Sequence, residues 1–114
     1  MRLAERRCSR CTADTPTLSE AEARDQLRLL HGWTLAQRGG RPVLSRTFEF
    51  KGFMPGVELV DKIAAIAESE GHHPDLHLAY GSLTVDLTTH VAGGLTENDF
   101  ILAAKIDEDA APKS

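Results

Sequence analysis

Apolar residues recur along the chain at two intervals, and these predict alternating helices and strands. The first helix begins after Ser19, because Ser19 and Glu22 have the spacing of a capping box. Its apolar face repeats at i, i+4 and i+7, at Ala23, Leu27 and Leu30. Gly32 suits a helix C-cap, so we expect this helix to end at His31-Gly32.

A first hairpin follows, with strands over residues 33–37 and 43–50. Gly39-Gly40 predicts the turn between them, since glycine tolerates the positive φ of tight hairpins. Arg46 interrupts the apolar side of the second strand. We therefore expect that strand to lie near a sheet edge or a pocket.

A second helix is predicted over residues 53–70, with apolar residues on about half of its circumference. Such a helix can cover a sheet and still keep apolar surface for another subunit. The alternative is that the first helix covers the remainder. The pattern leaves both interpretations open.

A second hairpin and a third helix complete the pattern. Residues 76–80 and 83–90 alternate with period two, and Thr96 and Asp99 have capping-box spacing at the start of the last helix. The order αββαββα predicts a two-layer α+β fold, with a four-stranded, antiparallel sheet and three helices on one face. We expect a single domain over residues 18–109, with a flexible tail at 1–17 and another at 110–114.

Composition narrows the class of protein. The chain has 114 residues, 41% of them hydrophobic, which suits one globular domain. It contains no apolar run of about 18 residues, so we expect neither a membrane span nor a secretory signal. The formal net charge of -4 argues against a nucleic-acid partner. Only two cysteines occur, so a reducing cytoplasm is the expected location.

The candidate chemistry lies in a cluster of histidines at the predicted junctions between elements. Four of the five fall within nineteen residues, at His72, His73, His77 and His90. Histidine is the side chain best suited to exchange protons near neutral pH, and junction loops concentrate functional residues. Pro74 restricts the backbone of His73. For each histidine the alternative is a purely structural role. Asp99 also has a structural explanation, because a carboxylate at this position stabilises the start of a helix.

Zinc binding is the competing chemical interpretation. The four clustered histidines could supply nitrogen ligands, but their spacing matches no standard zinc pattern. Cys8-Ser-Arg-Cys11 is a lone CxxC, for which a chance or weakly structural pair is the simplest reading. The role of the two cysteines stays open.

Seven positions with fixed gaps carry a more specific signal: Glu68, His72, His73, Pro74, Tyr80, His90 and Asp99. In this spacing the chain resembles the pterin-4a-carbinolamine dehydratase family. Gly32-Trp33, the segment Phe50-Lys-Gly-Phe53 and the segment Asn98-Asp-Phe-Ile101 strengthen the resemblance, which covers about residues 18–107. Bacterial members with an amino-terminal CxxC fit the same pattern.

The resemblance implies a homodimer or homotetramer and a reaction that needs no cofactor. That reaction is the loss of water from 4a-hydroxytetrahydropterin to give quinonoid dihydropterin, which recycles the pterin. Carried over by position, His72, His73 and His90 line the pterin pocket, with His73 and His90 as the acid/base pair and His72 orienting the pterin. The remaining motif positions are implied to bind the substrate: Glu68 and Asp99 by orienting histidines or contacting the pterin, Tyr80 by supporting the pocket floor, and Pro74 as a further member of the set.

A second function is implied by the same resemblance. Residues 68–78 and 94–105 look especially like a dehydratase-like branch that includes RuBisCO assembly factors. For this branch the implied partner is RuBisCO, and the protein would act as a binding protein or chaperone without catalysis.

Overall fold

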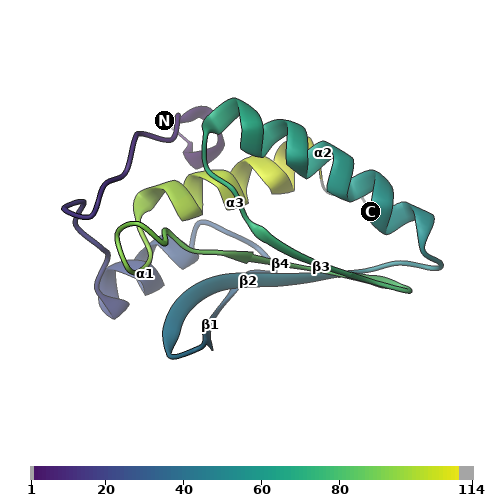
Figure 1. The fold of residues 1–114 in the computed structure, drawn as a ribbon, viewed down its shortest axis with the longest axis horizontal. Coiled ribbons are helices and arrows are strands. Elements are labelled where there is room, and N and C mark those ends of the chain that lie inside the picture. Colours follow the sequence, from purple (N-terminus) through teal and green to yellow (C-terminus); the bar gives the residue numbers. More distant parts are fainter. Residues whose placement is uncertain (1, 111–114) are drawn as a thin grey trace.

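A computed structural model describes residues 2–110, which form a four-stranded antiparallel sheet backed by helices (Figure 1). The order αββαββα and the α+β class are confirmed, with a short 3₁₀ helix, η1, added at the amino terminus. The elements are η1 Leu3–Glu5, α1 Glu20–Leu27, β1 Thr34–Arg38, β2 Arg41–Glu49, α2 Met54–Glu70, β3 Asp75–Ala79, β4 Ser82–Leu87 and α3 Glu97–Asp109.

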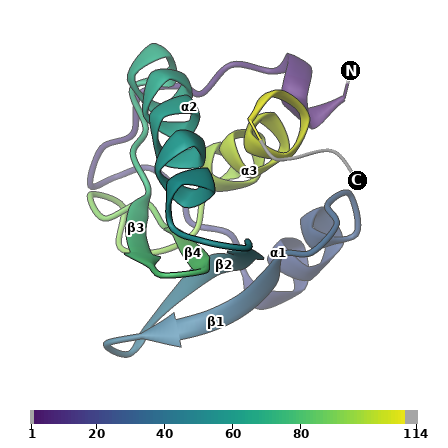
Figure 2. The ribbon, with the colours of Figure 1, turned by 90° about the vertical axis from the view of Figure 1, so that its right-hand side faces the viewer.

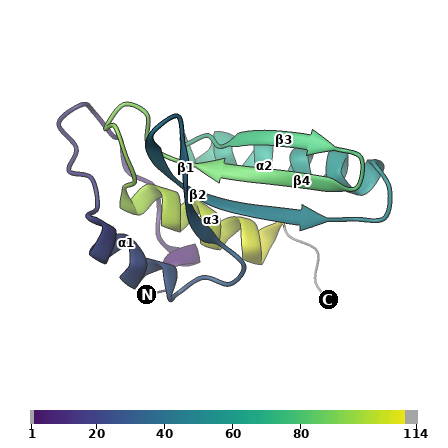
Figure 3. The same ribbon diagram turned by 90° about the horizontal axis from the view of Figure 1, so that it is seen from below.

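The sheet has the strand order β1-β2-β4-β3, and every neighbouring pair is antiparallel. Helices α2 and α3 lie on one face of the sheet (Figure 2), and α1 lies at one end of the long axis of the molecule (Figure 1). Figure 3 shows the opposite face of the sheet, with α2 and α3 behind the strands. The chain therefore builds two layers, with the core between sheet and helices.

The core follows from the alternation of the inner strands. Leu44 pairs with Leu87 across β2 and β4, and both side chains are fully buried. Helix α3 supplies Phe100 and Ile106, and α2 supplies Ile63, all with no exposed surface. Burying such side chains drives folding, so these elements hold the layers together.

Arg46 lies on an inner strand, not at a sheet edge, and its charge is met by α3. Its Nη1 donates to Asp107 Oδ1 at 2.6 Å and to the His31 carbonyl at 3.2 Å. Trp33 Nε1 donates to both carboxylate oxygens of Asp107 at 2.9 Å. Burial raises the pKa of Asp107, although the Trp33 and Arg46 donors act in the opposite direction. A polar cluster therefore joins β2, α3 and the buried indole of Trp33.

The first helix is shorter than expected and ends at Leu27 instead of His31-Gly32. The amides of Leu29 and Leu30 donate to carbonyls three residues back, which tightens the chain into turns. The periodic Leu30 is nevertheless buried, so the pattern identified the correct apolar side but not the end of the helix.

The amino-terminal segment, for which we expect a flexible tail, lies along α3. Leu3 is buried, and Lys105 Nζ donates to the Ala4 carbonyl at 2.8 Å. Arg6 forms an ion pair with Glu97 at the start of α3. At the other end Ala110 is buried, and the rest of the expected carboxyl-terminal tail lies outside the described residues.

Within residues 2–110, no helix has both the length and the apolar character needed to cross a bilayer.

Candidate active site

The three motif histidines line one cavity of about 480 Å³. His72 and His73 follow Gly71, which ends α2 in the left-handed conformation (φ 65°), and His90 follows the last residues of β4. Thr88 and Thr89 form the wall next to His90. Cavities of this volume suit small organic ligands. The end of α2 and the segment after β4 thus bring the three histidines to one cavity.

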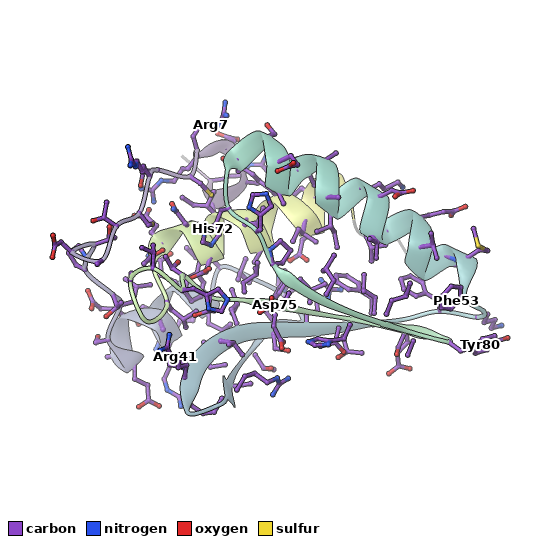
Figure 4. The ribbon with its side chains drawn as sticks, viewed as in Figure 1. Arg7, Arg41, Phe53, His72, Asp75 and Tyr80 are labelled. Carbon is purple, nitrogen blue, oxygen red and sulfur yellow. The ribbon has the colours of Figure 1, made fainter. Side chains whose placement is uncertain are left out.

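His72 is the most enclosed of the three. Its side chain is 10% exposed, and its Nε2 lies 2.6 Å from Asp99 Oδ1. Figure 4 shows His72 below the carboxyl end of α2. A carboxylate at this distance fixes the orientation of an imidazole ring. His72 is therefore held in place by α3.

Asp99 has no exposed surface and shares its second oxygen with the start of α3. Oδ2 accepts from the Thr96 N–H and from Thr89 Oγ1, both at 3.0 Å. A buried carboxylate is tolerated when its oxygens are hydrogen-bonded, and here three groups meet it. Asp99 therefore contacts both the helix cap and a histidine of the cavity.

His73 lines the same cavity as His72 but contacts a different carboxylate. Its Nε2 lies 2.6 Å from Glu68 Oε2, and the two side chains are 59% and 78% exposed. Glu68 lies in the last turn of α2, five residues before His73. The motif glutamate thus meets the second histidine at the cavity rim.

His90 has a carboxylate neighbour that sequence reasoning missed. Its Nε2 lies 3.6 Å from Asp75 Oδ2, and the His90 side chain is 68% exposed. Asp75 opens β3 directly after Pro74 (Figure 4). Its place in the segment His72-His-Pro-Asp75 was a signal, but only the pairing of β3 with β4 brings it to His90.

Four motif residues are not part of the cavity wall: Glu68 and Asp99, which each contact one of the histidines, and Tyr80 and Pro74. Tyr80 is 80% exposed at the turn between β3 and β4, at the opposite end of the molecule from His72 (Figure 4). The expected contribution of Tyr80 to the pocket floor has no counterpart in this chain's own cavity. Pro74 is half-buried and connects His73 to β3.

A second cavity of about 360 Å³ lies on the open side of the sheet and shares His90 and Thr88 with the first. It is lined by Asp86, which is 4% exposed and accepts from Arg38 Nε at 3.0 Å. His77 Nε2 lies 4.0 Å from the same carboxylate. The fourth clustered histidine therefore belongs to a polar group on the open face and not to the cavity of the other three.

Another part of the cavity wall comes from the amino-terminal segment, where Cys8, Ser9, Arg10 and Cys11 line the cavity. Sequence pattern does not predict these residues here, since the segment has no periodicity. In residues 2–110, no group of three or more histidine, cysteine or acidic side chains is arranged to hold a metal ion.

Three carboxylate–histidine pairs around one cavity suit proton transfer to and from a small ligand. In each pair the carboxylate can hold the ring so that its other nitrogen is available for exchange. His73 and His90 are open to a ligand, whereas His72 is nearly enclosed.

Proteins of one known family are similar to this chain over nearly its whole length. The family described as pterin 4 alpha carbinolamine dehydratase matches residues 16–109. The chain is 45% identical over 108 residues to the mitochondrial pterin-4-alpha-carbinolamine dehydratase 2 of Arabidopsis thaliana, covering 93% of this chain and 58% of the plant protein. A Marinobacter nauticus protein, provisionally assigned the same activity, is 42% identical and is covered over 96% of its length.

Two solved structures are also similar to this chain. The crystal structure of a transcriptional coactivator/pterin dehydratase from Brucella melitensis superposes with a TM-score of 0.74 at 35% identity, covering 84% of this chain and all of that one. A pterin dehydratase-like RuBisCO assembly factor of the alpha-carboxysome shares the fold, with a TM-score of 0.58 at 23% identity. The family match covers residues 16–109 and ends with the last residue of α3. The chain therefore belongs to the pterin-4a-carbinolamine dehydratase family.

Proposed function

We propose that this chain catalyses the loss of water from a 4a-hydroxytetrahydropterin to give the quinonoid dihydropterin. The observation that carries the proposal is the convergence of His72, His73 and His90 on one cavity, each with a carboxylate within 3.6 Å. Family membership supplies the substrate class, and the cavity is large enough for a small bicyclic ligand.

The reaction requires two proton transfers. The bond between C4a and the hydroxyl oxygen breaks as an acid protonates the leaving oxygen, and a base accepts a proton from a ring nitrogen. His73 and His90 are the acid/base pair, since both are exposed enough to reach a ligand and exchange protons with water. His72, held by Asp99, orients the pterin.

The carboxylates act as positioning residues in this scheme. Glu68 holds His73, and Asp75 lies beside His90.

The homologous plant protein is named as mitochondrial, whereas for this chain we retain the cytoplasm as the expected location, consistent with two free thiols.

The test is an assay in which an aromatic amino-acid hydroxylase generates the carbinolamine and its decay is followed. We expect His73→Ala and His90→Ala each to lower kcat/KM by about 10²-fold or more, because each removes one partner of a proton transfer. His31→Ala is the matched control, since His31 is exposed and lies outside the cavity. Folded protein that does not accelerate the decay above the spontaneous rate would refute the proposal.

The competing function is RuBisCO assembly without catalysis, suggested by residues 68–78 and 94–105. Co-expression with RuBisCO, followed by measurement of soluble holoenzyme, separates the two functions. We expect an unchanged yield together with a positive dehydratase assay. A raised yield that survives His73→Ala would favour the assembly factor instead.

A further inference from the structure

One wall of the histidine cavity comes from a segment more than sixty positions earlier in the chain. Residues 8–11, here called the strap, line the cavity together with His72, His73 and His90. Figure 4 shows Arg7, which precedes the strap, beside the carboxyl end of α2. The proposed reaction assigns no role to these four residues.

A buried amide holds the middle of the strap. Asn98, 4% exposed in the first turn of α3, accepts from the Ser9 N–H at 3.0 Å and donates to the Ser9 carbonyl at 2.6 Å. Its Nδ2 also lies 3.1 Å from Cys11 Sγ. All the hydrogen bonds of this side chain therefore go to the strap, and it precedes Asp99, the partner of His72.

A buried carboxylate holds the start of the strap. Glu70, whose side chain is 5% exposed, accepts from the Cys8 N–H at 2.8 Å. Arg7 Nε lies 3.0 Å and Lys105 Nζ 3.9 Å from its other oxygen. Glu70 is the last residue of α2, directly before the glycine that leads into His72. Both anchors of the strap thus adjoin residues that position His72.

The strap presents surface suited to a flat ring. Burial raises the pKa of Cys8 to about 12, so this sulfur remains a thiol near neutral pH and serves as a packing surface, not a nucleophile. Thiols are polarizable and pack well against aromatic rings. A wall of this kind can contact a bicyclic ligand without exchanging protons with it.

We infer that the strap is a wall of the substrate site, and that Asn98 is the positioning residue that holds it against the bound pterin. The inference rests on the proposed function for the identity of the ligand. It assigns binding, and not proton transfer, to the strap.

The kinetic test compares Asn98→Ala with Gln37→Ala, which removes an exposed amide from β1. Losing the strap's hydrogen bonds should raise KM for the carbinolamine by about tenfold while kcat changes by less than about threefold. Gln37→Ala should leave both constants unchanged. Ser9→Pro, which removes the strap's own N–H donor and leaves α3 intact, should reproduce the effect if Asn98→Ala folds poorly.

The second readout does not depend on turnover. Iodoacetamide labels Cys11, and trypsin separates it from Cys8 by cleavage after Arg10. Saturating 7,8-dihydrobiopterin should slow Cys11 labelling of the wild-type protein about fivefold or more. Asn98→Ala should label faster than wild type without ligand.

The outcomes distinguish the two claims. The inference alone would be overturned if the wild-type enzyme is active, Asn98→Ala leaves its KM unchanged, and the pterin does not change the rate of Cys11 labelling. A folded wild-type protein that neither dehydrates the carbinolamine nor binds the dihydropterin would overturn the proposed function, and the strap inference with it.

Discussion

Asp99 contacts both the start of α3 and a histidine of the candidate site. Its Oδ2 accepts from the Thr96 N–H at the start of α3, and its Oδ1 holds His72. The two oxygens can be separated by experiment, because an amide keeps one acceptor and loses the charge.

We expect Asp99→Asn to lower kcat/KM by about 10²-fold, since the amide can still cap α3 but no longer presents a carboxylate to His72. The measurement is the pH profile of kcat/KM, which should change shape, together with the thermal midpoint, which should fall little. Asp109→Asn, at the exposed end of α3, is the control. A loss of activity that only tracks a loss of stability, with an unchanged profile, would assign Asp99 to the fold alone.

At this scale the sequence predicts that three histidines lie near one another, but it does not predict all of their neighbours. The spacing of His72, His73 and His90 predicts that they group together. Asp99 and Glu68 belong to the same seven-position motif. Asp75 and Asn98 could not be predicted in the same way, because their roles depend on the register of β3 against β4 and on the path of the amino-terminal segment. Neither has a periodic signal.

Among the elements, α1 owes its start to a capping box that the structure confirms. Ser19 Oγ accepts from the Glu22 N–H at 3.1 Å, and Glu22 Oε1 accepts from the Ser19 N–H at 2.9 Å. The hydrogen bonds from Ser19 lower the pKa of Glu22 below its ordinary value of 4.5. The folded state therefore favours the charged form.

We expect Glu22→Gln to be less stable than wild type above pH 4.5, because the variant keeps an acceptor but loses the charge. The difference should shrink as the pH falls through the lowered pKa of folded Glu22, where wild type is protonated too. Urea unfolding at pH 7 and at pH 3 measures it. A difference that is the same at both values would show that the charge adds nothing to the cap.

Element types were predictable and their ends less so. Strict period two gave β4, but the strand stops at Leu87, and Thr89 makes only an isolated bridge to Gly94. A charge that interrupts an apolar side predicts that Arg46 lies near an edge or a pocket. It lies on an inner strand because Asp107 of α3 meets it, a contact that local pattern cannot reveal.

For the whole molecule, exposed apolar side chains gather at the end away from the histidine cavity. Phe53 and Tyr80 lie together there (Figure 4), and Met54 and Leu78 belong to the same two segments. Apolar clusters of this kind mark interaction surfaces. The homodimer or homotetramer expected from the sequence would have this end or the outer side of α2 as a contact.

We expect sedimentation to show at least a dimer at tens of micromolar, because association covers this apolar surface. Met54→Lys should weaken the assembly by placing a charge in the contact. Leu29→Lys, at a similarly exposed residue beyond α1, should leave it intact. A monomer for the wild-type protein at these concentrations would contradict the expectation.

The polar cluster around Asp107 gives the protein a built-in optical probe. Trp33 is its single tryptophan, 5% exposed, with its indole nitrogen bonded to Asp107 between sheet and helix. Unfolding transfers this indole to water and shifts its emission to longer wavelength. Trp33 does not line the histidine cavity. Its fluorescence therefore reports whether β2 and α3 remain packed together when residues of the cavity are changed. Every active-site variant can thus be tested for an intact core by its own light emission, without an added label.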